Sequence, residues 1–228
     1  MKKVLLLCAV LSVNYIFSQE IKYGIKGGIN SSNFSQKHTS FTGFSPGYIS
    51  GGKVGFQAGF FVEIPLSEKF SLQPELIYSR LRGNNTKSLQ LMSSAGDFTT
   101  GHLKGVEKYS FLELPIMLKY NIFKKFNLEF GPQLQYTLAA RVDEDLYVEG
   151  EKVQQFGGYD FEKNSSRSIL GEFSKLNFGL NFGASYDINK NIFIQGRYNL
   201  GLTKFNESFR ESFSLKNSNV QISLGYRF

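Results

Sequence analysis

The chain has 228 residues and a formal net charge of +7, and its Lys and Arg residues are scattered without a basic run. This length fits one domain or one barrel of modest size, and the scattered charge argues against a nucleic-acid partner. The composition includes 23 Phe, 12 Tyr, 23 Gly and no Trp, which suits strands facing lipid and a crowded lumen. Beyond the amino terminus no apolar run approaches the ~20 residues of a spanning helix, so a membrane crossing would use strands.

Residues 1–19 have the features of a secretory signal peptide. Two lysines precede the short apolar run Val4–Val13, which is too short for a spanning helix. Cys8 lies inside this run and is the chain's single cysteine. The expected mature chain, 20–228, therefore contains no thiol nucleophile and no thiolate metal site.

Eight later segments alternate apolar and polar residues with a period of two, as strands with one apolar face do. Each runs for about 10 residues or slightly more, close to the ~9–11 of a tilted membrane strand and longer than the ~5–6 of a globular strand. Pro74 removes one ladder donor from the third segment and predicts a bulge there. The segments are Ile21–Asn30, Lys53–Ile64, Phe70–Leu81, Tyr109–Tyr120, Phe126–Ala139, Leu176–Ile188, Ile192–Leu202 and Asn219–Phe228.

The connections between these segments alternate between short and long. This alternation predicts an all-β fold: an eight-stranded antiparallel up-and-down transmembrane β-barrel with short periplasmic turns, long extracellular loops and both mature termini in the periplasm. The alternative is a soluble lipocalin-like barrel, in which the apolar faces would point inward. The short connections are Pro65–Lys69, Asn121–Lys125 and Asn189–Asn191, and the long ones are Ser31–Gly52, Arg82–Lys108, Ala140–Lys175 and Thr203–Ser218.

In a membrane barrel the polar faces would line the lumen, and they carry charges of both signs. Eight strands leave an interior only wide enough for side chains, and buried charges must be paired. We therefore expect an interior polar network centred on Glu75, Glu113 and Arg197, with a path for ions or small solutes as the alternative. Its members would be Lys22, Lys26, Glu63, Glu75, Glu113, Lys119, Glu129, Asp187, Arg197 and Arg227.

The last strand ends on an aromatic residue. Tyr226 and Phe228 lie on its apolar face, and a terminal strand ending in Phe resembles the C-terminal signal that the barrel-insertion machinery reads in outer-membrane β-barrels. The insertion machinery and outer-membrane lipid are therefore expected partners, and the final strand is expected to close the barrel by pairing with Ile21–Asn30.

Several segments of the mature chain carry sequence patterns of barrel construction: G-I-K-G-G-I-N at Gly24–Asn30, F-S-L-Q-P-E-L-I-Y-S at Phe70–Ser79, F-L-E-L-P-I-M-L-K-Y at Phe111–Tyr120, F-N-L-E-F-G-P-Q-L at Phe126–Leu134, and Y-N-L-G-L-T at Tyr198–Thr203. With these motifs and the C-terminal strand, the chain resembles the PorT-like outer-membrane β-barrel family of Bacteroidetes, also described as a porin family. The resemblance implies location in the outer membrane of a Gram-negative cell and carries no catalytic residue or cofactor site. One named member of that family belongs to a secretion and gliding apparatus, so envelope or secretion-complex proteins are possible partners.

The candidates for chemistry lie in the predicted external loops. His38 and His102 are the only histidines, and His102 lies near Ser93, Ser94 and Asp97. A histidine beside a nucleophile would suit a lipid-modifying enzyme. An ordinary loop role for both histidines is the preferred interpretation.

An acidic loop, Asp143–Asp145 with Glu149 and Glu151, contains carboxylates that could hold Ca²⁺ or Mg²⁺, although the EF-hand spacing is absent. The preferred interpretation is a solvated loop without a metal. As a whole, the sequence favours a non-enzymatic envelope anchor, adhesion scaffold or component of a secretion or envelope complex, without a cofactor. A lipid-modifying enzyme and a narrow small-solute channel are the alternatives.

Overall fold

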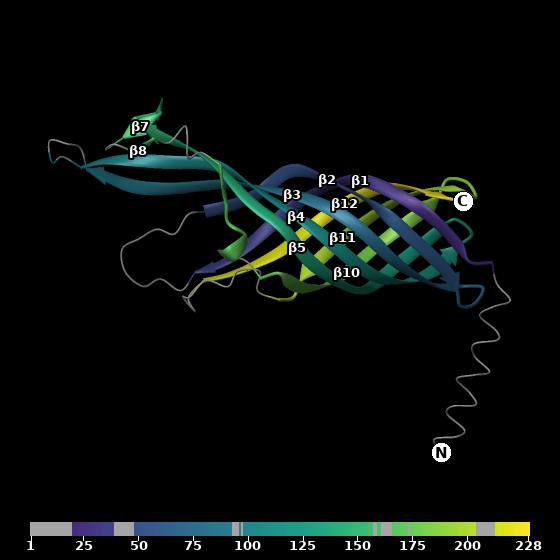
Figure 1. The fold of residues 1–228 in the computed structure, drawn as a ribbon. Coiled ribbons are helices and arrows are strands. Elements are labelled where there is room, and N and C mark those ends of the chain that lie inside the picture. Colours follow the sequence, from purple (N-terminus) through teal and green to yellow (C-terminus); the bar gives the residue numbers. More distant parts are fainter. Residues whose placement is uncertain are drawn as a thin grey trace, which may run out of the picture.

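Eight long antiparallel strands form a closed barrel in the computed structural model (Figure 1). The structure describes residues 20–38, 48–92, 96, 98–156, 159–160, 166–172, 174–203 and 213–228. The expected signal peptide lies outside these residues. The barrel strands are β1 (Lys22–His38), β2 (Tyr48–Pro65), β3 (Phe70–Met92), β4 (Phe98–Phe123), β5 (Phe126–Val148), β10 (Leu176–Asp187), β11 (Ile192–Gly201) and β12 (Phe213–Arg227).

Each barrel strand pairs with its neighbours in the sequence, and two further pairings complete the ring. β5 pairs with β10, although several short elements lie between these two strands in the sequence. β12 pairs with β1 along Gly24↔Arg227 to His38↔Phe213. The predicted eight-stranded antiparallel barrel, closed by its last strand against its first, is therefore confirmed.

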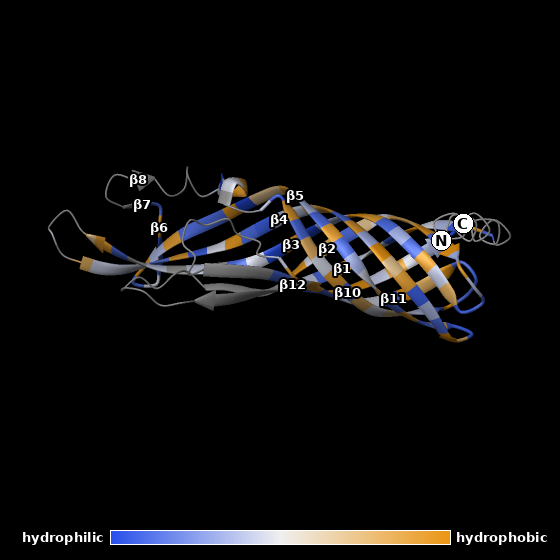
Figure 2. Ribbon diagram, turned by 90° about the horizontal axis from the view of Figure 1, so that it is seen from below, coloured by the Kyte–Doolittle hydropathy of each residue, from blue (hydrophilic) through white to orange (hydrophobic). Residues whose placement is uncertain are grey.

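The two faces of the barrel wall differ in polarity, as the alternating colours along each strand show (Figure 2). On β1, the side chain of Ile25 is 44% exposed whereas that of Lys26 is 5% exposed. On β12, Ile222 and Leu224 point outward and Gln221 and Ser223 point inward. Apolar residues thus lie outside and polar residues inside. This arrangement suits lipid and is the reverse of a soluble barrel.

The three predicted short turns are confirmed, because β2–β3, β4–β5 and β10–β11 are joined by four residues or fewer. These turns, the start of β1 and the end of β12 lie at one end of the barrel, which we call the turn end. At the other end, which we call the arm end, β3, β4 and β5 continue well beyond the barrel (Figure 1).

The predicted long loops 82–108 and 140–175 differ from the structure. β3 and β4 remain paired as far as Met92↔Phe98, and β5 continues to Val148. These extensions form an arm, which we define as residues 83–92 and 98–107 together with 141–153. The alternation of apolar and polar residues did not predict the arm, because a strand outside lipid does not need an apolar face.

Short elements decorate the arm. β6 (Glu151–Val153) and β9 (Ser166–Ser168) pair with β5, and β7 (Gln155–Phe156) pairs with β8 (Tyr159–Asp160). The described part of the chain has one turn of 3-10 helix, η1 (Leu170–Glu172), and no helix that is long and apolar enough to cross a membrane. A small apolar core lies where the arm leaves the barrel, formed by Leu81, Tyr109, Phe111, Ala140, Val142 and Ile169.

The bulge predicted at Pro74 is wrong. The registers of β3 with β2 and with β4 are the same on both sides of Pro74. The ladder accommodates the missing donor without inserting a residue. Register shifts occur instead in β2, between Ser50 and Lys53 and between Lys53 and Phe56.

Candidate functional site: the barrel interior

Arg197 of β11 reaches across the lumen to β3, which lies four strands away in the ring of eight. Its guanidinium donates two hydrogen bonds to the Glu75 carboxylate, at 2.9 and 3.0 Å, and a third to Glu129 Oε2 at 2.8 Å. Lys26 Nζ lies 2.7 Å from Glu75 Oε2, the oxygen that also accepts one of the Arg197 hydrogen bonds. These four buried side chains, which we call the central cluster, contain two cations and two anions and are formally neutral.

Amide side chains add hydrogen bonds to the central cluster, although Glu129 Oε1 and Arg197 Nε are buried without a partner among the described residues. Gln195 accepts from Lys26 at 2.9 Å and donates to Glu129 at 2.7 Å, and Gln73 donates to Glu75 at 2.6 Å. All of these side chains are buried. Because charge-assisted bonds between buried groups are strong, the cluster ties four different strands together across the lumen.

Glu113 does not have the predicted ionic partner. Its carboxylate accepts hydrogen bonds from Ser79 Oγ at 2.6 Å and from Gln135 Nε2 at 3.0 Å, and no described Lys or Arg forms an ion pair with it. Glu113 is nonetheless buried. The centre of the predicted network is therefore wrong at this residue, since the second carboxylate that Arg197 binds belongs to Glu129, another predicted member of the network.

A second group of charges lies nearer the turn end. Glu63 Oε2 lies 3.1 Å from both Lys119 Nζ and Arg227 Nε, and Arg227 also lies 2.8 Å from Asp187. These four residues, which we call the rim cluster, are again formally neutral. Lys22 stands opposite Glu63 in the β1–β2 register, but its side chain is exposed at the barrel rim.

Two phenylalanine rings lie in the lumen beside the rim cluster. Phe61 and Phe193 are 2% and 0% exposed, and their rings meet edge to face with centroids 5.5 Å apart. The Arg227 guanidinium lies 4.5 Å from the Phe193 ring centroid. Gly24 and Gly225 make room for these rings, because a Cβ at either position would collide with one of them. Sequence reasoning missed both rings, although the alternation of each strand places them on the inward face.

The two C-terminal aromatics lie on the outer face at the turn end. Tyr226 and Phe228 are 44% and 66% exposed, and their ring centroids are 5.5 Å apart. The Phe228 amide donates a hydrogen bond to the Tyr23 carbonyl at 2.9 Å. The residues expected to form the insertion signal therefore sit at the seam where the last strand meets the first.

His102 lies on the arm and not in a loop. Its Nδ1 is 3.1 Å from Ser88 Oγ, across the β3–β4 ladder in which the two residues stand opposite each other. This is a serine–histidine contact on an exposed surface. The side chain of His38 and residues Ser93, Ser94 and Asp97 lie outside the described residues.

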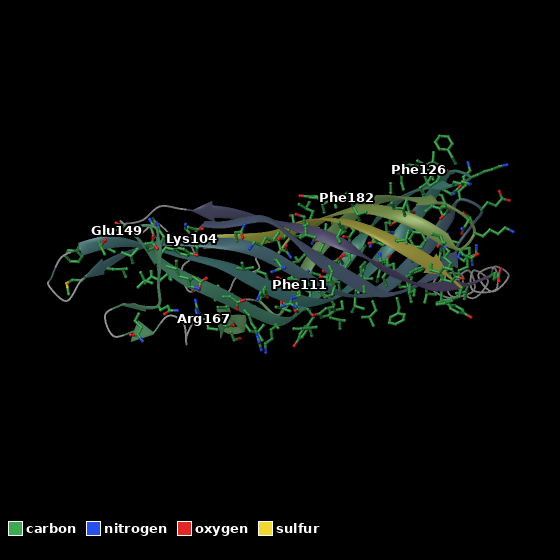
Figure 3. The ribbon with its side chains drawn as sticks, turned by 90° about the horizontal axis from the view of Figure 1, so that it is seen from above. Lys104, Phe111, Phe126, Glu149, Arg167 and Phe182 are labelled. Atoms are coloured by element: carbon green, nitrogen blue, oxygen red, sulfur yellow. The ribbon has the colours of Figure 1, made fainter. Side chains whose placement is uncertain are left out.

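The predicted acidic loop is part of a strand and a tight turn. Glu149 and Gly150 have φ values of 52° and 91° and join β5 to β6, as the central residues of a type I′ turn do. Asp145 lies 2.9 Å from Lys152. Figure 3 shows Glu149 and Lys104 on the arm and Phe111 closer to the barrel.

Asp143 pairs with Lys108 of β4. The hydrogen bond from Lys108 holds the pKa of the Asp143 carboxyl below its usual range, and the nearby charge of Arg141 acts in the same direction. Among the described residues, no three side chains of His, Cys, Asp or Glu gather closely enough to hold a metal ion.

A family model described as outer membrane protein beta-barrel domain matches residues 17–207, which is most of the chain. The protein belongs to this family. It is an outer-membrane β-barrel protein, in agreement with the outward apolar faces and the closed ring. The match supports the broader part of the sequence-based resemblance, whereas the PorT-like subgroup remains a proposal.

Members of this barrel class with solved structures resemble the chain weakly in sequence. Ail, the attachment invasion locus protein of Yersinia pestis, is 13% identical, with a TM-score of 0.43 over 92% of this chain and 100% of that one. OprG of Pseudomonas aeruginosa is 12% identical, with a TM-score of 0.41 over 91% and 95%. The protease OmpT of Escherichia coli is 10% identical, with a TM-score of 0.40 over 91% and 96%. The comparison with curated proteins finds no match.

Proposed function

We propose that the protein is a non-enzymatic outer-membrane barrel that anchors the arm at the cell surface, where the arm serves adhesion or assembly with envelope or secretion-complex proteins. The observation that carries this proposal is the continuation of β3, β4 and β5 beyond the barrel. β4 has 26 residues, whereas β11 has 10. About 9–11 residues suffice to cross a membrane, so most of the surplus forms a protruding surface.

The proposal places the turn end in the periplasm and the arm outside the cell. Short turns on the periplasmic side and long segments on the external side are the usual asymmetry of outer-membrane barrels. Removal of the expected signal peptide, residues 1–19, would leave both mature termini in the periplasm. Tyr226 and Phe228 would then lie where the insertion machinery can read them.

The lumen is proposed to be closed. The central cluster joins opposite walls of the barrel, and the rim cluster lies between it and the turn end. Phe61 and Phe193 fill the space beside the rim cluster. We expect the purified protein to show no steady conductance in planar bilayers, because an ion would have to break these pairs to pass. Steady single-channel steps would contradict the closed lumen and favour the channel alternative.

Removing the end of the arm tests its role. We expect a variant that replaces residues 84–106 with an Asn-Gly turn to insert normally, because Gly83 and Glu107 stand opposite each other and the turn can join them. The variant should lose the associations of the intact protein, measured by cross-linking from intact outer membranes and by adhesion of cells to surfaces. Unchanged association in a correctly inserted variant would contradict the proposed role of the arm.

The Ser88–His102 contact supports a second candidate, an outer-membrane lipid-modifying enzyme. Against it, the contact is exposed, so water would solvate both groups and weaken any activation of the serine. We expect His102→Ala to leave the turnover of lipid A and phospholipid unchanged in cells whose only copy of this protein is the variant. A loss of turnover, with normal barrel insertion, would establish the enzyme and contradict the non-enzymatic proposal.

A further inference from the structure

Cations face one another across three neighbouring strands where the arm leaves the barrel. Arg82 of β3 stands opposite Lys108 of β4, and Lys108 stands opposite Arg141 of β5. Arg80 lies two residues from Arg82 on the same face. Like charges directly opposite each other destabilise a sheet, so this arrangement costs stability unless an anion offsets it.

All four side chains point away from the barrel axis. Leu81, Tyr109, Ala140 and Val142 are buried in the interior at 0 to 1% exposure. Because side chains alternate along a strand, the residues next to them face outward. These outward neighbours are Arg80, Arg82, Lys108 and Arg141.

The described residues offset this charge only in part. Asp143 pairs with Lys108 and lies near Arg141. No described carboxylate pairs with Arg80 or Arg82, and the Nε of Arg80 is buried without a hydrogen-bond partner. A buried donor without a partner is costly. Arg80 as a whole is half-buried, so an external acceptor would approach the rest of its guanidinium.

A pocket of about 300 Å³ opens beside these cations, lined by Val54, Gly55, Phe56, Arg80, Arg82 and Lys108. The two register shifts in β2 lie at this point. Bulges of this kind bend a strand and redirect its side chains, which accounts for the space between β2 and β3. Gly55 allows the close approach of the strands, because a Cβ there would collide with the Arg80 carbonyl oxygen.

We infer that the pocket lies at the level of the membrane surface, because the outward residues of β3 change there from the apolar Leu76 and Tyr78 to Arg80 and Arg82. Phe56 and Tyr78 are exposed on the outer wall with ring centroids 6.1 Å apart, and Phe56 stands directly opposite Arg80. Exposed aromatics mark the boundary between hydrocarbon and head groups in membrane barrels. The cations next to Phe56 and Tyr78 therefore lie where the phosphates of lipid head groups are found.

We propose that Arg80, Arg82 and Lys108, with Arg141 beside them, bind the phosphate of an anionic lipid head group in the leaflet at the arm end. Guanidinium groups match phosphate oxygens in a bidentate geometry, and Lys108 adds a point charge. The bound phosphate offsets the repulsion between the strands and holds the base of the arm at the membrane surface. This inference rests on the proposed function for the orientation of the barrel.

The test compares the intact protein with the variant R80Q/R82Q/K108Q. The control K69Q/K124Q/K125Q removes three positive charges from exposed residues in two turns at the opposite end. Each protein is reconstituted in phosphatidylcholine nanodiscs. Binding of bisphosphorylated lipid A, of dephosphorylated lipid A and of inorganic phosphate is measured by titration and native mass spectrometry.

We expect the variant to bind bisphosphorylated lipid A about tenfold or more weakly than the intact protein, because several charge-assisted bonds are lost. The control should differ by less than about twofold, since its charges lie at the other interface. The intact protein should bind dephosphorylated lipid A as weakly as the variant binds bisphosphorylated lipid A. Equal losses of affinity in the variant and the control, or no loss in the variant, would contradict the proposed binding site. Saturation by inorganic phosphate alone would mean that the site binds free phosphate and not a lipid head group.

Failure of this inference is distinguishable from failure of the proposed function. The variant keeps the arm and the closed lumen, so its heat-dependent shift on gels, its lack of conductance and its arm-dependent associations should equal those of the intact protein. If the intact protein binds no bisphosphorylated lipid A while these properties persist, the lipid site is wrong and the anchoring role stands.

Discussion

Replacement of Gly28 with valine is expected to prevent closure of the barrel. Gly28 lies on β1 opposite Ser223 of β12, at the seam between the first and last strands. A Cβ there would collide with the carbonyl oxygen of Ile222 and lie 2.7 Å from the Cα of Ser223. Both are backbone atoms, so no side-chain rotation relieves the contact. The measurement is the heat-dependent mobility shift on gels, which we expect the variant to lose.

Gly27→Val is the matched control, one residue away on the same strand. The nearest atom to a Cβ at Gly27 is the Gln57 carbonyl oxygen at 3.7 Å, which is ordinary van der Waals contact. Its side chain would point to lipid, where valine is favourable. We expect this control to assemble like the intact protein. A normal mobility shift for Gly28→Val would contradict the geometry of the seam.

Replacement of Arg197 with methionine is expected to lower the free energy of unfolding by about 3–5 kcal/mol, the usual cost of removing one partner from a buried ion pair. The change leaves Glu129 without a cation and takes two hydrogen bonds from Glu75. The central cluster would then carry a net negative charge in the buried interior. Urea unfolding of the protein in liposomes, followed by fluorescence or gel mobility, measures the effect.

The double variant R197M/E129Q restores neutrality, because Lys26 and Glu75 remain as a pair 2.7 Å apart. We expect it to recover part of the lost stability. As a control, Lys152→Met removes an ion pair whose two side chains are 54% and 43% exposed. Exposed pairs contribute about 1 kcal/mol or less. If R197M unfolds like the intact protein, the central cluster does not stabilise the barrel.

Much of the barrel could be predicted from alternation alone. The inward positions of Lys26, Glu75 and Arg197 follow from the period of two, because a residue on one face of a strand stays on that face as long as no bulge intervenes. The same rule places Phe61 and Phe193 in the lumen. Both were missed because an apolar residue was expected to face lipid. Pro74 and Glu113 show the limits of the rule, since it predicts faces and not registers or partners.

The sequence by itself determined the number of barrel strands, the polarity of each face and the positions of the three short turns, because contact with lipid imposes an apolar face on every crossing strand. Only the tertiary structure decided which charges meet, since partners such as Glu75 and Arg197 come from opposite walls and their contact depends on the stagger of strands around the ring. It also decided the length of the arm and the alignment of Arg82, Lys108 and Arg141. Outside lipid, hydrogen bonds between strands can extend a sheet whose sequence has no alternating apolar pattern, so the sequence does not predict the extension.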